Sequence, residues 1–173
     1  MDTNLVIHLL QISVALIFFA NKSFVLVGKR FGWFLGALAA FIAVFYFYLI
    51  QLYIYTVLEV GLIILMGYGF IKPKENNGLE LAIRLTIAGI MLILSMFAFN
   101  GLLTIYELLS SAGLLFGTYF LTHSKVKLGW FISGLAHLLA MQLGYEKNQN
   151  FFADFQLASA IISFIGITIK SKN

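Results

Sequence analysis

Isolated polar side chains within long apolar runs are the residues of this sequence that are best able to do chemistry. Glu59 is the single charged residue between positions 31 and 71, Glu107 lies in the apolar run 102–122, and His137 lies centrally in the run 128–144. A charged side chain in hydrocarbon costs about 2.5 to 3.5 kcal/mol on insertion scales, so such residues usually face a cavity or a partner. Carboxyl and imidazole groups there could bind a polar solute or carry a proton. The alternative for Glu59 is a neutral carboxyl that hydrogen-bonds a neighbouring helix.

Amides and aromatic rings supply the remaining candidates for a binding site. Gln11 and Gln156 could donate hydrogen bonds to a polar solute, with ordinary bonding between helices as the alternative. Trp33, Trp130 and Tyr68 offer faces on which a flat ring can stack. The two tryptophans follow basic loops, so an interfacial aromatic belt explains them as well.

Other kinds of chemistry have no support in the sequence. It contains no cysteine, and a lone histidine within an apolar run is a poor basis for a metal site. Neither a His-Glu-x-x-His motif nor a phosphate-binding loop occurs. We therefore expect no enzyme activity, no cofactor and no metal.

The composition predicts where these residues reside. The chain has 173 residues, of which 61% are hydrophobic and 10% charged, and a water-soluble domain of this size could not hide so much apolar surface. A span needs about 20 apolar residues, which allows about six to eight spans and little outside the bilayer. The composition thus excludes a soluble catalytic or nucleic-acid-binding domain. The basic residues that give the chain its net charge of +4 are expected to determine the orientation of the helices in the membrane.

An internal repeat divides the longest apolar run. Residues 31–71 are too many for one span, so a turn must divide them. No Pro occurs in this run, and no Gly occurs in its central part, 37–60, to mark where the turn lies. When the sequence is shifted by 97 positions, seven of the 17 residues from 32 to 48 are identical to those from 129 to 145. At this offset the polar loop 146–150 overlies 49–53, which predicts a turn near Gln51 and seven spans in total. Glu59 then corresponds to Gln156, and we expect both to face a shared central cavity.

The basic residues fix the expected orientation. With seven spans, ten of the eleven Lys and Arg residues fall on one side of the membrane and only Lys147 on the other. The positive-inside rule then predicts an outer N-terminus and a cytoplasmic C-terminus. The expected plan is a three-helix unit over 1–72, a loop and linker helix over 73–100, and a second, parallel three-helix unit over 101–173. The linker helix itself is expected from Leu81 to Phe99. Arg84, the basic residue well inside a run, is expected to snorkel to the cytoplasmic surface.

Short motifs in both units resemble one family. Along the chain they read Gln11-Ile-Ser13, Trp33-Phe-Leu-Gly36, Phe45-Tyr-Phe-Tyr48, Gly67-Tyr68-Gly69-Phe70, Glu107-Leu-Leu-Ser110, Trp130 and Gly166. With the three-plus-one-plus-three plan, also found in SWEET sugar transporters, they resemble the PnuC family of vitamin-precursor transporters. The resemblance implies a carrier for nicotinamide riboside, thiamine or riboflavin.

We therefore expect an all-α membrane protein of the plasma (inner) membrane that transports a small vitamin-like solute by alternating access. The expected partners are the solute and the lipid bilayer, without nucleic acid, and a homo-oligomer stays open. The alternative is a non-transporting accessory subunit whose intramembrane carboxylates bind a partner helix. The identity of the vitamin and the choice between proton coupling and facilitated diffusion are open at this point.

Overall fold

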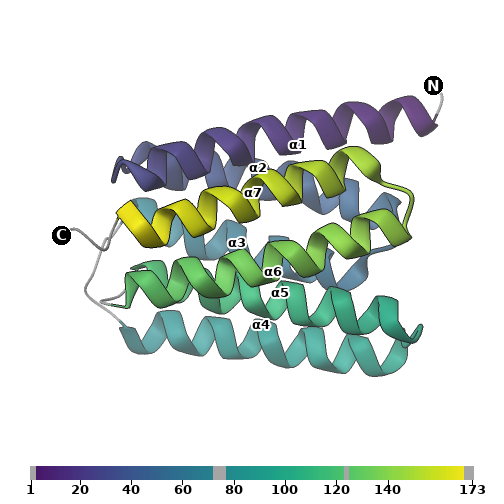
Figure 1. Cartoon of the computed structure of the whole chain (residues 1–173). Helices are drawn as coiled ribbons and strands as arrows, with labels where there is room; N and C mark the ends of the chain where they lie inside the picture. The colour runs from purple at the N-terminus through teal and green to yellow at the C-terminus, as the bar shows by residue number, and fades with distance from the viewer. Residues whose placement is uncertain (1–2, 72–76, 123–124, 170–173) are drawn as a thin grey trace. The chain divides into compact units, whose positions relative to one another are not determined.

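The computed structural model describes residues 3–71, 77–122 and 125–169. In these ranges the chain forms seven α-helices, shown from purple to yellow in Figure 1. Their bounds are α1 Thr3–Leu26, α2 Phe31–Leu49, α3 Tyr53–Ile71, α4 Asn77–Phe97, α5 Leu102–Thr122, α6 Val126–Glu146 and α7 Asn150–Ile169. Helices satisfy all their backbone hydrogen bonds internally, which a chain this apolar requires within hydrocarbon.

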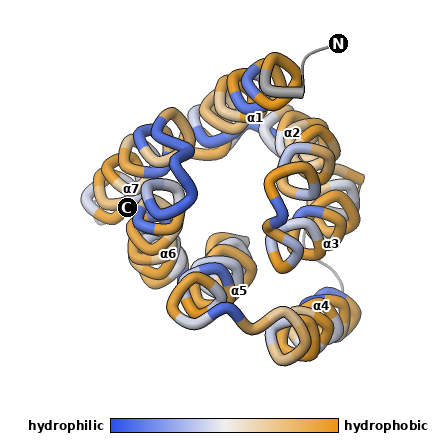
Figure 2. The backbone as a smooth tube through the Cα atoms, turned by 90° about the vertical axis from the view of Figure 1, so that its right-hand side faces the viewer, coloured by the Kyte–Doolittle hydropathy of each residue, from blue (hydrophilic) through white to orange (hydrophobic). Residues whose placement is uncertain are grey.

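Six of these helices are long and apolar enough to cross a membrane, and within α3 the segment Tyr53–Gly67 is a shorter apolar helix. Hydrophobic residues dominate the helices, while a hydrophilic segment connects α6 to α7 (Figure 2). The predicted all-α class is confirmed for the described residues, and the apolar helices indicate an integral membrane protein.

The chain divides into two compact units, Met1–Met91 and Leu92–Asn173. In the first unit α2 packs against both α1 and α3, and in the second unit α6 packs against both α5 and α7. The boundary between the units falls within α4, so this helix continues from one unit into the other. The predicted three-part division, with a linker over 73–100, stays a prediction.

The predicted turn near Gln51 is confirmed, since α2 ends at Leu49 and α3 begins at Tyr53. Gln51 has a positive φ of 59° and donates its N–H to Tyr48 O, while the Leu52 N–H bonds Phe47 O. These two bonds make a Schellman motif, which usually has glycine at the left-handed position. Gln51 takes that position instead, so the turn had no Gly or Pro to mark it.

Small residues allow the neighbouring helices to approach closely. A methyl group added at Gly129 of α6 would lie 2.6 Å from the backbone nitrogen of Leu121 and 2.9 Å from Gly117 O, both on α5. In the first unit, a methyl group at Gly32 would lie 3.0 Å from the backbone nitrogen of Val25 on α1. Close backbone approach through small residues is typical of helices that associate in membranes.

Candidate functional site

A hydrogen bond between α6 and α7 lies in the interior of the second unit. His137 Nδ1 and Gln156 Oε1 are 2.5 Å apart, and each residue is only 5% exposed. An amide oxygen only accepts hydrogen bonds, so Nδ1 of His137 carries the hydrogen and donates it. This bond fixes the orientation of the imidazole ring. Of the eight predicted site residues, these two are brought into direct contact.

The same interior contains many other polar side chains. Nine buried polar residues of α5, α6 and α7 contribute to it, namely Thr104, Glu107, Ser110, Ser111, Ser133, His137, Gln156, Ser159 and Ser163. Two of the serines bond carbonyls of their own helices: Ser110 Oγ donates to Tyr106 O at 2.5 Å and Ser163 Oγ to Ser159 O at 2.8 Å. Such bonds satisfy a hydroxyl without a partner on another helix.

Some buried polar atoms of the second unit have no hydrogen-bond partner among the described residues. Ser111 Oγ, Ser133 Oγ and Trp130 Nε1 are examples. The Trp130 ring lies against α7, because a methyl group added at Gly166 would be 2.5 Å from its Cδ2. Buried polar groups are nearly always paired, so these atoms are suited to bind a polar ligand or water.

Glu59 occupies the interior of the first unit. It is 3% exposed, and its Oε2 has no hydrogen-bond partner among the described residues. The position 97 residues before His137 is Ala40, which is fully buried and has no polar group to offer. Glu59 and Gln156 belong to different units, so their predicted shared cavity stays a prediction.

The remaining predicted residues have varied surroundings. Gln11 of α1 is buried and forms a side-chain hydrogen bond with Tyr46 of α2, so it serves at least as a link between helices. Trp33 is half-buried on α2, and Glu107 is buried on α5. Tyr68 lies in α3, but its side chain is outside the part that the structure describes.

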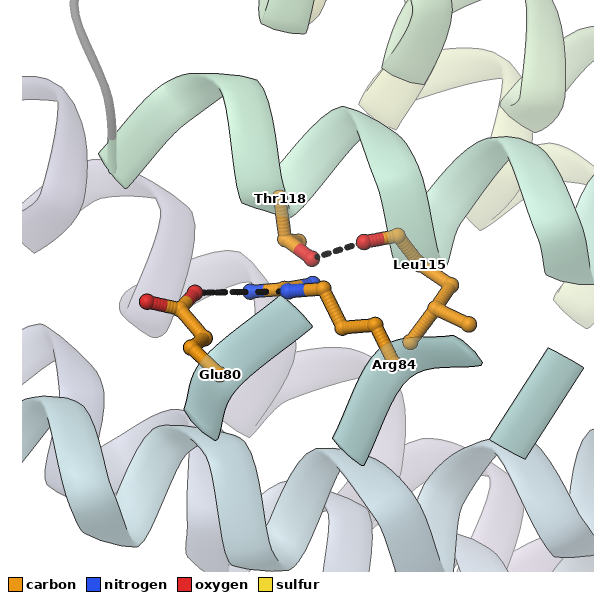
Figure 3. Close-up of polar contacts among 4 residues, drawn as sticks. All are labelled: Glu80, Arg84, Leu115 and Thr118. Atoms are coloured by element: carbon orange, nitrogen blue, oxygen red, sulfur yellow. Dashed lines mark hydrogen bonds and ion pairs between the residues drawn. The ribbon is translucent and has the colours of Figure 1, made fainter. Parts of the chain in front are cut away.

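Arg84 does not snorkel as expected. It is 2% exposed, and its Nη2 lies 2.7 Å from Glu80 Oε1 (Figure 3). The two residues are four positions apart on α4 with the acid first, the favourable order on a helix. The predicted start of this helix at 81 left Glu80 outside it, whereas α4 begins at Asn77. Figure 3 also shows Thr118 of α5, whose hydroxyl donates to Leu115 O of the same helix at 2.9 Å.

The sequence interpretation missed the polar stripe of the second unit. Gln156, Ser159 and Ser163 follow the spacing i, i+3, i+7, which places them on one face of α7. Thr104, Glu107 and Ser111 repeat this spacing on α5 and could have been found by the same test. Single serines are common in membrane helices, which is why only the pattern carries the signal.

No group of three His, Asp or Glu side chains in the described ranges is arranged to hold a metal ion. In comparisons with known proteins, no family model matches the chain, and neither a curated protein nor a solved structure matches it. A function must therefore be inferred from the residues and their contacts.

Proposed function

We propose that the protein is a membrane transporter for a small vitamin-like solute such as nicotinamide riboside or thiamine. The solute crosses by alternating access, through motion of two parallel three-helix units joined by a linker helix. The observation that carries this proposal is the recurrence of the same backbone hydrogen bonds and the same buried helix face 97 residues apart. Parallel repeats of this kind are a common plan of secondary transporters.

The turn between α2 and α3 and the turn between α6 and α7 support the repeat. Asn148, 97 positions after Gln51, also has a positive φ, of 55°. Its N–H bonds Tyr145 O at 3.0 Å, and the Gln149 N–H bonds Gly144 O at 2.8 Å. The corresponding bonds at Gln51 and Leu52 are 3.2 and 2.9 Å long, so both turns are Schellman motifs with the same register.

The buried face of the central helix recurs as well. The buried residues of α2 are Gly32, Gly36, Ala39, Ala40, Ala43, Tyr46 and Phe47. Each has a buried counterpart on α6 at the same offset: Gly129, Ser133, Ala136, His137, Ala140, Leu143 and Gly144. The central helix of each unit thus contacts its two neighbours through equivalent positions, although most of the paired residues differ in type.

Side-chain chemistry distinguishes the two units and indicates the class of solute. Seven of the nine buried polar positions of α5, α6 and α7 correspond to residues without a polar side chain in the first unit, namely Ile7, Leu10, Val14, Gly36, Ala40, Leu62 and Met66. Hydroxyl, amide and imidazole groups suit a solute that bears several hydroxyls. None of the nine residues is Lys or Arg, so no permanently charged cation among them would neutralise a phosphate group. We therefore propose that the dephosphorylated vitamin is carried and its phosphate ester excluded.

The proposed orientation has the N-terminus outside and the C-terminus in the cytoplasm. Lys22, Lys29 and Arg30 lie at the α1–α2 end of the first unit, where Arg30 Nη2 also donates to Phe70 O near the end of α3 at 3.1 Å. Lys147 follows α6 at the opposite end of its own helix from Lys125. The excess of basic residues at one end of the helices supports a cytoplasmic location of that end.

Counterflow in liposomes tests the transport function. Vesicles that contain the purified protein and are loaded with unlabelled nicotinamide riboside should transiently accumulate labelled nicotinamide riboside from outside. Vesicles loaded with unlabelled thiamine should likewise accumulate labelled thiamine. An excess of the matching phosphate ester should not compete. Absence of counterflow with nicotinamide riboside, thiamine and riboflavin, for protein that remains folded, would overturn the transporter proposal. Stable co-purification with another membrane protein would then favour the accessory subunit.

A further inference from the structure

The carboxyl group of Glu59 has an unusual setting for an acid. It lies in the interior of the first unit on α3, an apolar helix, and Oε2 is buried without a hydrogen-bond partner among the described residues. An ionised carboxylate in such a setting would lose its hydration and gain nothing in return. This setting therefore favours the neutral carboxyl, with its proton bound, in this conformation.

Among the described residues of the helices in contact with α3, no charged or titratable group offers a compensating positive charge to Glu59. Helix α2, which packs against α3, contains no Asp, Glu, Lys, Arg or His, and its buried Tyr46 bonds Gln11. On α4, whose Ile87 lies against Gly61 of α3, the charged side chains are Glu80 and Arg84, which pair with each other.

The rest of α3 is similarly poor in such groups. The other titratable residues among its described side chains are Tyr53 and Tyr55, which are not cations at neutral pH. The neutral state of Glu59 thus follows from its packing neighbours as well as from its own burial.

The counterpart of Glu59 in the second unit lacks the ability to titrate. Gln156 stands at the position 97 residues later, and its amide oxygen accepts the hydrogen bond from His137. An amide has nearly the shape of a protonated carboxyl but cannot release a proton. The repeat therefore combines one titratable group with one permanently neutral group at corresponding positions.

We propose that Glu59 is the proton-binding site of a solute–proton symporter, an inference that rests on the transport function proposed above. In a second conformation water reaches the carboxyl, the O–H bond breaks, the proton passes to water, and the bonding electron pair stays on the carboxylate. Return to the conformation described here requires Glu59 to bind a proton again, since the ionised form is excluded from the interior. One proton then moves with each solute molecule.

Infrared spectroscopy of the purified protein tests the proton site without transport. The spectrum at neutral pH should show a protonated-carboxyl C=O band that is lost in Glu59→Gln. Glu146→Gln is the matched control, because Glu146 is exposed at the end of α6 and accepts a hydrogen bond from Gln142 Nε2 at 3.1 Å. That substitution should leave the band unchanged. A wild-type spectrum identical to that of Glu59→Gln in the carboxyl region would overturn the proposal.

Transport against a gradient tests the coupling. In vesicles with an acidic exterior, wild-type protein and Glu146→Gln should accumulate solute several-fold above the level reached without a pH gradient. Glu59→Gln should only equilibrate the solute, and its unchanged elution in gel filtration would show that it folds. Gradient-independent uptake by the wild type, or accumulation retained in Glu59→Gln, would refute coupling through Glu59. If no solute is transported at all, the transporter proposal fails, while the infrared result still decides whether Glu59 holds a proton.

Discussion

The hydrogen bond between His137 and Gln156 predicts a measurable energetic coupling between α6 and α7. Replacing either residue by Leu leaves the other with an unpaired polar group in the interior. Such an unsatisfied group costs about 1 to 3 kcal/mol of unfolding free energy. When both residues become Leu, no polar group is left unpaired, so the double variant should be more stable than the sum of the single effects predicts.

The expected size of this coupling follows from the geometry. Hydrogen bonds between membrane helices contribute about 0.6 kcal/mol on average and about 1.7 kcal/mol at most. The Nδ1–Oε1 distance is 2.5 Å and both residues are 5% exposed, which favours the upper part of this range. We expect a coupling of about 1 to 1.7 kcal/mol, and about 1.4 kcal/mol corresponds to a tenfold change in the unfolding constant.

A double-mutant cycle measured by reversible unfolding in mixed micelles is the suitable assay. The tryptophan fluorescence of Trp130, in the same unit, can report the transition. A control cycle pairs His137→Leu with Thr168→Val, because Thr168 is exposed and donates to Ile165 O of its own helix. That cycle should be additive within about 0.5 kcal/mol. Equal additivity in the cycle of His137 and Gln156 would refute the hydrogen bond as a link between the helices.

Two further predictions concern helix packing and topology. Gly129→Ala should lower the stability by about 1 to 2 kcal/mol, because overpacking costs about 1 to 3 kcal/mol while the gain in helix propensity is at most about 1 kcal/mol. Gly89→Ala, which meets nothing within 4 Å, should be neutral or stabilising in the same assay, and equal effects of the two substitutions would contradict the close approach of α5 and α6. Gln51→Cys, at an exposed turn, should react with an impermeant thiol reagent added to intact cells, whereas protection until lysis would reverse the proposed orientation.

The sequence alone determined the class of the protein and the number of its helices. The length and apolar character of the chain limited the architecture to membrane helices, because the thickness of the bilayer fixes how many residues one helix can use. The same limit required a break within 31–71. The internal repeat located that break at Gln51 although no glycine or proline marks it, because equivalent positions share a backbone conformation even where their residue types differ.

The helix boundaries limited what the sequence could predict about polar partners. Placing the start of the fourth helix at 81 separated Arg84 from Glu80, and the pair became evident only with a helix that begins at Asn77. Hydropathy marks where apolar residues begin, whereas the first turn of this helix is polar. The hydrogen bonds of the helix therefore extend beyond the apolar run.

Only the tertiary structure decided which side of each helix faces its neighbours. Tyr46 and Phe47 are buried while the next residue, Tyr48, is 62% exposed, although Tyr46 and Tyr48 are the same residue type. The pairing of His137 with Gln156 likewise depends on the register of α6 against α7. In a soluble protein an amphipathic pattern reveals the buried face, but lipid and protein interior are both apolar. Both faces of these helices are thus largely apolar, and outside the polar stripe of the second unit it is packing between the helices that distinguishes them.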